Sequence, residues 1–226
     1  MKVLAIGAHP DDIELGCGAT LAAHRADGDQ LTMLVMTTGE QGPQASRSRV
    51  HEQEEAAAML GAEIVWGGFD DGAIPSDRLA ISLVESLVRS RGIDTIYTHS
   101  AADTHQDHRA TALASMGAAR RSGRILHYES PTTTTFNPTV HVDVAEYMDA
   151  KLALIRAHLS QVLKNGLVDI EAVEAQARYR GFAARMRYAE SFEAPRFSWG
   201  VGQARRDDVT RRTDFDLPID LEDSKR

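Results

Sequence analysis

The sequence predicts a Rossmann-like three-layer α/β/α sandwich with a mostly parallel sheet. Short apolar runs typical of buried strands alternate with longer segments of helical periodicity as far as residue 128. Parallel strands need crossover connections, and helical crossovers cover both faces of the sheet. With 226 residues, 42% of them apolar, the chain can also form a full core. We therefore expect a single α/β domain over residues 1–202.

The expected elements follow one another in strand–helix order. The first strand, 3–8, contains the continuous apolar run Val3-Leu4-Ala5-Ile6-Gly7, which favours burial on both faces. The alternation then predicts, in order, a helix over 17–27, a strand over 31–36, a helix over 47–60, a strand over 63–66, a helix over 77–90, a strand over 94–98, a helix over 108–120 and a strand over 125–128.

The alternation breaks after Pro131, where the run Thr132-Thr133-Thr134-Thr135 and Pro138 interrupt it. Beyond this point we expect a short strand over 141–144 and two helices over 145–159 and 170–188. Residues 203–226 are rich in Arg, Asp and Glu and poor in aromatic residues. That composition predicts a charged tail that is mobile or contacts another subunit of a homo-oligomer.

Composition argues against several classes of partner. The net charge is −8 and the sequence pI is about 5.6, so no overall basic field attracts nucleic acid or an anionic membrane. No apolar run approaches the roughly 18 residues that a membrane span needs, and the run before His9 is too short for a signal peptide. With a single cysteine, Cys17, the chain forms no intrachain disulfide. We therefore expect a cytoplasmic protein that acts on a small molecule.

Two polar stretches carry metal-ligand chemistry. Ala8-His9-Pro10-Asp11-Asp12-Ile13-Glu14 follows the first strand, and His105-Gln106-Asp107-His108 follows the strand over 94–98. Open α/β sheets bind ligands at the carboxyl ends of their strands. A catalytic zinc takes three His or carboxylate ligands and leaves a fourth position for water, so we predict His9, Asp12 and His108 as ligands. The same donors accept Zn²⁺, Fe²⁺, Co²⁺ or Mn²⁺.

Residues beside these ligands are suited to proton transfer. Adjacent loop residues point in different directions, so Asp11 can face the water as a general base. His105 shares a helix face with His108 and can stabilise the oxyanion or protonate the amine, with Asp103 or Asp107 holding its tautomer and raising its pKa. Alternatively, an Asp at a strand end caps the next helix, and His-x-x-His is ordinary surface or capping chemistry.

The two stretches resemble the signature motifs of the LmbE-like, or PIG-L, family of zinc-dependent N-acetyl-sugar deacetylases. Roughly residues 1–195 are similar to the family pattern, with further matches at Thr38-Gly39-Glu40-Gln41-Gly42, Arg49-Val50-His51-Glu52, Ala56-Ala57-Ala58-Met59-Leu60-Gly61, Tyr128-Glu129-Ser130-Pro131, Val142-Asp143-Val144, Lys151, His158-Leu159-Ser160-Gln161 and Ala189-Glu190-Ser191-Phe192. Gln106 stands where the family usually carries proline, and it is not a predicted ligand.

The resemblance implies the same roles as the residue types do. Zinc would be bound by His9, Asp12 and His108, with Asp11 as general base and His105 as the group that stabilises the oxyanion and assists the leaving amine. The predicted reaction removes an N-acetyl group from an amino-sugar-containing small molecule by attack of zinc-bound water.

Four further residues are placed around this centre. The resemblance implies a substrate contact for Arg49, whose guanidinium suits forked hydrogen bonds to sugar hydroxyls, although Arg49 could instead pair with Glu52 on its own helix. We expect Glu14 and Asp103 on the substrate side, Glu14 by orienting backbone or ligand hydrogen bonds, and Asp107 in contact with the residues around the metal rather than with the metal itself.

Other functions stay open at this point. An amidase that cleaves a sugar-amide conjugate of a low-molecular-weight thiol would use the same chemistry on a larger acyl group. A non-catalytic sugar-binding module and a nucleotide-dependent oxidoreductase belong to other classes. Gly16-Cys17-Gly18 lacks the complete Gly-x-Gly-x-x-Gly spacing that dinucleotide binding needs.

Four other features have both a functional and a structural interpretation. Cys17 is a reactive thiol or, more simply, a small buried apolar residue. The segment 37–48 is a substrate lid or a flexible surface loop. Asp70-Asp71-Gly72 forms part of a pocket rim or a turn. His158 lines the pocket or lies in a helix interface.

Overall fold

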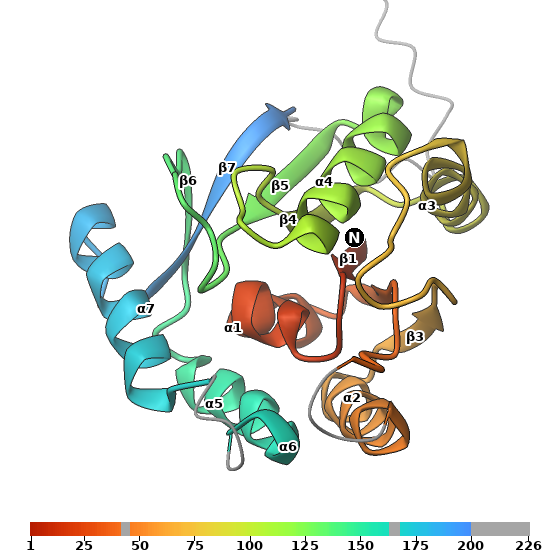
Figure 1. Cartoon of the computed structure of the whole chain (residues 1–226). Coiled ribbons are helices and arrows are strands. Elements are labelled where there is room, and N and C mark those ends of the chain that lie inside the picture. The colour runs from red at the N-terminus through yellow and green to blue at the C-terminus, as the bar shows by residue number, and fades with distance from the viewer. Residues whose placement is uncertain (42–45, 163–167, 200–226) are drawn as a thin grey trace, which may run out of the picture.

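The computed structural model describes residues 1–41, 46–162 and 168–199, and its centre is a seven-stranded sheet (Figure 1). The strand order is β3-β2-β1-β4-β5-β7-β6. The strands are β1 (Lys2–Gly7), β2 (Gln30–Val35), β3 (Glu63–Trp66), β4 (Thr95–His99), β5 (Arg124–Tyr128), β6 (Val140–Asp143) and β7 (Ala189–Phe197). The helices are α1 (Asp12–Ala26), α2 (Ser46–Leu60), α3 (Arg78–Arg91), α4 (Gln106–Ala118), the 3₁₀ turn η1 (Ala119–Arg121), α5 (Met148–Ala157), α6 (Leu159–Val162) and α7 (Ile170–Ala184).

The strands from β3 to β5 pair in parallel, whereas β7 is antiparallel to both β5 and β6. In the central strand β1, Val3 lies opposite Leu31 of β2 and Thr95 of β4. The chain runs outward from β1 through β2 to β3 and then returns to place β4 on the other side of β1. This reversal makes the carboxyl ends of β1 and β4 the switch point at which open α/β sheets bind ligands.

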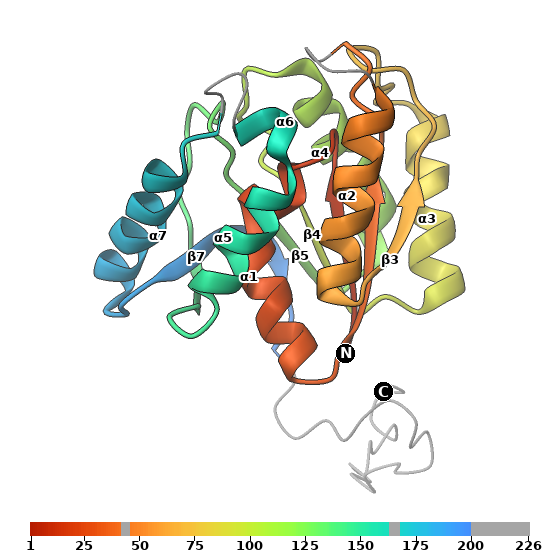
Figure 2. The same ribbon diagram turned by 90° about the horizontal axis from the view of Figure 1, so that it is seen from below.

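Alternate side chains of β1 enter two apolar clusters on opposite faces of the sheet. Val3 and Ala5 belong to a cluster that includes residues of α1, α2 and α5, and these helices lie in front of the sheet in Figure 2. Leu4 and Ile6 belong to a cluster with residues of α3 and α4. The predicted three-layer sandwich with a mostly parallel sheet is confirmed. None of the described helices combines the length and the apolar character that crossing a membrane requires.

Several predicted boundaries were wrong. The helix expected over 17–27 begins at Asp12, because the acidic turn after β1 is already helical, and its backbone leaves helical geometry only at Cys17. The helix expected over 170–188 ends at Ala184, where Arg185 takes a left-handed conformation with φ 63°. The helix expected over 145–159 is shorter, Met148–Ala157.

The sequence prediction missed strand β7. Ala189–Phe197 follows the last helix and pairs with β5 and β6, so its position depends on partners distant in sequence. Its pairing places it between the parallel part of the sheet and β6. The predicted tail over 203–226 lies outside the described residues, as do residues 42–45 of the segment suggested as a lid.

Gly16 gives a test of how tightly α1 packs on the sheet. A Cβ at Gly16 would clash with the ring of Tyr128, which is fully buried and donates a hydrogen bond to the carbonyl oxygen of Ile6 at 2.7 Å. We expect Gly16→Ala to lower the free energy of unfolding by about 1–3 kcal/mol in urea titrations, because overpacking a rigid core forces the backbone to move.

Gly18 is the matched control, since a Cβ there meets only ordinary contacts, with Cδ1 of Leu154 nearest at 3.6 Å. Gly18→Ala should be neutral or stabilising because alanine favours helix. Equal stability of the Gly16→Ala variant and the unmodified protein would show that the Tyr128 ring does not limit how closely α1 packs on the sheet.

Candidate active site

The imidazole of His9, directly after β1, lies among three carboxylates. Its Nδ1 is 3.4 Å from Oδ2 of Asp12, and its Nε2 is 3.1 Å from Oδ1 of Asp71 and 3.2 Å from Oδ2 of Asp107. Burial alone would lower the pKa of His9, but the contacts with Asp107, Asp12 and Asp71 raise it to about 12. Negative charge is therefore concentrated where a bound cation would be stabilised.

His108, in the first turn of α4, faces Asp12 from another side. Its Nε2 is 3.4 Å from Oδ1 of Asp12, and its Nδ1 is 3.2 Å from Oδ2 of Asp103. Burial would lower the pKa of His108, but Asp12 and Asp103 raise it to about 9. Because Asp103 holds Nδ1, the ring presents Nε2 to Asp12.

A third imidazole, His99, was missed from the sequence. It is fully buried at the carboxyl end of β4, with Nε2 3.1 Å from Oδ2 of Asp12 and its ring stacked on that of His108 at 4.0 Å between centroids. Burial and the nearby His108 lower the pKa of His99 to about 4. The signal that could have found it is the one used for His9, since His99 directly follows the strand predicted over 94–98. In the structure it is the last residue of that strand.

Ligand atoms of three groups of described side chains lie within 4.8 Å of one another, namely His9, His105 and His108, then Asp12, His99 and His108, then His9, Asp71 and Asp107. Of the predicted ligands, His9 and His108 belong to the first group and Asp12 and His108 to the second, so His108 is common to both. Asp12 also reaches both rings, with carboxylate oxygens 3.4 Å from Nδ1 of His9 and 3.4 Å from Nε2 of His108. Imidazole nitrogens and carboxylate oxygens suit Zn²⁺, Fe²⁺, Co²⁺ and Mn²⁺. The residues present therefore fit a divalent cation.

Asp11 is the residue immediately before α1, and its backbone has a left-handed conformation with φ 99° and ψ −24°. Such a conformation costs a non-glycine residue about 1–3 kcal/mol and is concentrated at functional sites. Its carboxyl is buried, and burial followed by the charge of Asp12 raises its pKa to about 7. A carboxylate with this pKa accepts a proton efficiently near neutral pH.

His105 lies beside both predicted histidine ligands. The centroid of its ring is 4.8 Å from that of His9 and 4.6 Å from that of His108. Its Nδ1 accepts a hydrogen bond from the backbone N–H of Asp107 at 3.2 Å, which selects the tautomer with a proton on Nε2.

The expected net rise in the pKa of His105 is not found, although the charge of Asp107 does act in that direction. Burial, then the neighbouring His108 and His9, lower that pKa. The two carboxylates instead contact the His108 and His9 rings. The structure therefore gives His105 the properties of a neutral hydrogen-bond donor.

Arg49, on α2, is buried and reaches the turn that carries Asp11. Its Nη2 donates to the carbonyl oxygen of Pro10 at 2.8 Å, its Nη1 donates to the carbonyl oxygen of Gly39 at 3.3 Å, and Nη2 lies 3.8 Å from Oδ1 of Asp11. Its Nε has no hydrogen-bond partner within the described part of the chain. The alternative pairing partner, Glu52, instead accepts hydrogen bonds from Ser160. A substrate contact for Arg49 stays a prediction.

The contacts of Glu14 and Asp103 favour positioning roles over the predicted contact with substrate. Glu14 is fully buried, accepts from Nε2 of Gln53 at 2.6 Å and lies 3.4 Å from Nε2 of His158. Asp103 is also buried, and its Oδ2 accepts from Oγ of Ser130 at 2.6 Å beside its contact with His108. Oε1 of Glu14 and Oδ2 of Asp103 are thus engaged in hydrogen bonds within the protein, whereas Oε2 of Glu14 faces His158 and has no hydrogen-bond partner among the described residues.

Asp107, in the first turn of α4, and Asp71, in the loop before α3, both contact the His9 ring. Asp107 accepts the backbone N–H of Gly72 at 2.6 Å and of Ile74 at 3.2 Å, so it joins this loop to the His9 ring. Asp107 thus lies beside the predicted ligand His9, and its predicted place off the metal stays a prediction, since His9, Asp71 and Asp107 themselves form one of the groups that could hold an ion. Asp71 lies in the turn suggested by Asp70-Asp71-Gly72, and its side chain also reaches His9.

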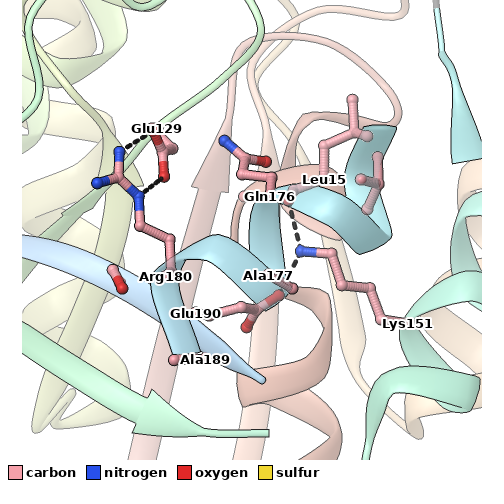
Figure 3. A pocket seen from close by; sticks show the side chains of 11 residues that line it. Leu15, Glu129, Lys151, Gln176, Ala177, Arg180, Ala189 and Glu190 are labelled. Atoms are coloured by element: carbon pink, nitrogen blue, oxygen red, sulfur yellow. Dashed lines mark hydrogen bonds and ion pairs between the residues drawn. The ribbon is translucent and has the colours of Figure 1, made fainter. Parts of the chain in front are cut away.

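A buried ion pair bridges the break in α1 at Cys17, and Figure 3 shows its members, Lys151 and Glu190, together with Leu15. At the break, Nζ of Lys151 donates to the carbonyl oxygen of Leu15 at 2.7 Å and to Glu190, whose carboxylate accepts the backbone N–H groups of Ala19 and Thr20 at 3.1 and 2.6 Å. The pair therefore replaces helix hydrogen bonds that the break removes. It borders a cavity of about 20 Å³, and no predicted site residue lines that cavity.

Cys17, at the break itself, is fully buried, and burial raises the pKa of its thiol well above the ordinary value. A reactive cysteine needs a lowered pKa and exposure. The structure therefore favours the interpretation of Cys17 as a small apolar core residue.

Residues 4–119 match the family model described as "PIG-L: GlcNAc-PI de-N-acetylase". The chain belongs to the PIG-L family. Its curated relatives include "Uncharacterized deacetylase YaiS" of Escherichia coli, which is 41% identical over 167 residues that cover 70% of this chain and 90% of that protein. They also include the diacetylchitobiose deacetylase of Thermococcus kodakarensis, 25% identical over 186 residues that cover 71% of this chain and 70% of that protein.

A solved structure, the conserved protein TT1542 from Thermus thermophilus, is similar to this one with a TM-score of 0.77 and 30% identity, over 90% of this chain and 98% of that protein. The family and these relatives support an enzyme that acts as a deacetylase. The suspected membership of the LmbE-like family is confirmed.

The Lys151–Glu190 pair predicts a large stability effect. Lys151→Met leaves the Glu190 carboxylate buried without its counter-charge, so we expect the free energy of unfolding to fall by about 3–5 kcal/mol. Urea titration measures this change in the free energy of unfolding. Arg156→Met, on the exposed face of the same helix, is the control and should change the free energy of unfolding by about 0.5 kcal/mol or less. Equal effects of the two substitutions would contradict the bridging role.

Proposed function

We propose that this chain is a divalent-metal-dependent hydrolase, with zinc as the expected metal, that removes an acetyl group from the nitrogen of an amino-sugar-containing small molecule. One observation carries the proposal: a carboxylate with pKa about 7 sits on a strained turn beside a cluster of imidazole and carboxylate donors. The relatives named as deacetylases of diacetylchitobiose and of an inositol glycoside of N-acetylglucosamine support this class of substrate.

His9, Asp12 and His108 would hold the cation. When bound, the cation polarises the amide carbonyl and lowers the pKa of water at the site. His99 contacts Asp12, and Asp107 and Asp71 contact His9, so these residues orient the ligands.

The remaining chemistry falls to two residues of the chain. Asp11 accepts a proton from water as the water oxygen bonds to the amide carbon, and it returns that proton to the nitrogen when the C–N bond breaks. His105 donates a hydrogen bond from Nε2 to the carbonyl oxygen as negative charge develops there. Water and the amide are consumed, and acetate and the free amine are formed.

A second candidate is cleavage of a sugar-amide conjugate of a low-molecular-weight thiol. The mycothiol S-conjugate amidase of Streptomyces coelicolor is 26% identical over 171 residues, which cover 61% of this chain. The same residues would act on a larger acyl group. A non-catalytic sugar-binding module is less favoured, because such a module has no need for a strained carboxylate with a raised pKa.

The substrate class is tested by incubating the zinc-loaded protein with N-acetylglucosamine, N,N′-diacetylchitobiose and their glycosides. Mass spectrometry should show loss of one acetyl group with stoichiometric acetate release, and a chelator should abolish it. Release of a larger acid from a thiol conjugate, with none of these acetylated sugars cleaved, would select the amidase. Turnover unaffected by complete metal removal would contradict the metal-dependent proposal.

The predicted ligands are tested by thermal shift. Zinc should raise the Tm of the chelator-treated protein, because a ligand that binds only the native state stabilises it by about 2.7 kcal/mol at 100 times Kd. Asp12→Ala should lose that shift. Asp77→Ala, which removes the exposed cap of α3, should lower the starting Tm and keep the shift. Equal shifts in both variants would exclude Asp12 as a ligand.

The base is tested by Asp11→Asn, which keeps the side-chain shape and removes the proton acceptor. We expect kcat to fall by about 10²–10⁴-fold while the zinc content of the protein stays the same. Steady-state kinetics and metal analysis of the same preparation give both numbers. Turnover equal to that of the unmodified protein would show that another group accepts the proton.

A further inference from the structure

The peptide group that joins Pro10 to Asp11 is held at both ends by side chains of α2. Its carbonyl oxygen accepts from Nη2 of Arg49 at 2.8 Å, and its N–H donates to Oε1 of Gln53 at 3.2 Å. Arg49 and Gln53 are four residues apart, so they share one face of the helix. Because the C=O and N–H of a trans peptide point in opposite directions, these two contacts fix the plane of the peptide.

That plane determines the backbone conformation of Asp11. Rotating the peptide about its long axis changes φ of Asp11, which is 99° and lies in a region that residues with a Cβ avoid. A conformation of this kind persists only when surrounding contacts impose it. The two α2 side chains supply such contacts immediately before the strained residue.

The orientation of the Gln53 amide is itself fixed. Gln53 is fully buried, and its Nε2 donates to Oε1 of Glu14 at 2.6 Å. The amide nitrogen is therefore directed to Glu14, which leaves the amide oxygen for the N–H of Asp11. Glu14 lies in turn 3.4 Å from Nε2 of the buried His158. The chain of contacts thus runs from the end of α5 through α1 and α2 to the peptide before Asp11.

We propose that Gln53 is a positioning residue that, with Arg49, clamps the Pro10–Asp11 peptide and so aims the Asp11 carboxylate. The proposal rests on the proposed function, in which Asp11 accepts the proton. Gln53 itself touches neither water nor substrate in this role. Its loss should therefore change the rate of the chemical step and leave binding of substrate and metal in place.

The direct test is Gln53→Met, which keeps the length of the side chain and removes both hydrogen bonds. We expect kcat on N,N′-diacetylchitobiose to fall by about 10–100-fold, because a displacement of about 1 Å at a reacting group has an effect of that size. KM should change by about twofold or less, since substrate binding is not involved. Zinc content should be unchanged, and a crystal structure of the variant should show Asp11 with a negative φ.

Glu52→Gln is the matched control on the same helix. Glu52 is buried next to Gln53 but accepts hydrogen bonds from the backbone N–H and Oγ of Ser160, at 2.9 and 2.6 Å, rather than from the turn after β1. This variant should lose stability while kcat and the conformation of Asp11 stay as they are.

A second pair of variants covers the case in which Gln53→Met fails to fold. Gln53→Glu keeps an acceptor for the Asp11 N–H but places a carboxylate against Glu14, so kcat should fall. Adding Glu14→Gln restores the donor and acceptor between the two positions and should recover most of the lost kcat. No recovery in a folded double variant would overturn the proposal.

The clamp and the proposed function fail in different ways. If the unmodified zinc-loaded protein releases no acetate from any sugar tested, the proposed function fails, and φ of Asp11 in crystal structures of the protein and its Gln53→Met variant still tests the clamp. A folded Gln53→Met variant that keeps φ of Asp11 near its present value, or keeps the unmodified kcat, would overturn the proposal.

Discussion

The tight turn between β1 and α1 is the constraint on which the candidate site depends. Strand β1 ends at Gly7 and α1 begins at Asp12, so very little chain is available to reverse direction. Asp12 helps to close this turn, because its Oδ2 accepts the backbone N–H of His9 at 2.7 Å. Asp11 completes it in a left-handed conformation. These short-range contacts place the side chains of His9 and Asp12 3.4 Å apart, while the Asp11 carboxylate lies 3.8 Å from Nη2 of Arg49.

Buried carboxylates then decide which imidazoles carry charge. His9 and His108 face carboxylates, which raise their pKa values to about 12 and about 9. For His99 and His105, burial and the charge of the neighbouring histidines lower the pKa and outweigh the nearby carboxylates. A divalent cation bound to the same donors would replace the positive charge of the two imidazolium groups, so its binding would release protons.

The sequence predicted the fold, and it singled out several residues that the structure brings together, because both follow from local rules. Apolar runs alternating with helical segments specify a parallel sheet, and polar residues after such strands gather at one edge. The antiparallel strand β7 could not be found in this way, since it pairs with β5 and β6 across long stretches of chain. The same reason explains the contacts of Glu14 and Asp103, whose partners Gln53 and Ser130 come from distant elements.

The pairing of each carboxylate with a particular ring was likewise beyond sequence reasoning. His105 and Asp107 are close in sequence, yet the Asp107 carboxylate contacts His9, and only its backbone N–H reaches the His105 ring. Spacing gives the residues that share a helix face, whereas packing of the 67–77 loop against α4 decides where their polar atoms point.

The central claim is that His9, Asp12 and His108 share one divalent cation while Asp11 stays beside it as a free carboxylate. Anomalous diffraction at the zinc edge from crystals of the zinc-loaded protein tests it most directly. The account predicts a single peak within bonding distance of those three side chains, with Asp11 outside the coordination sphere. A peak held instead by His9, Asp71 and Asp107, or a zinc ligated by Asp11, would contradict it.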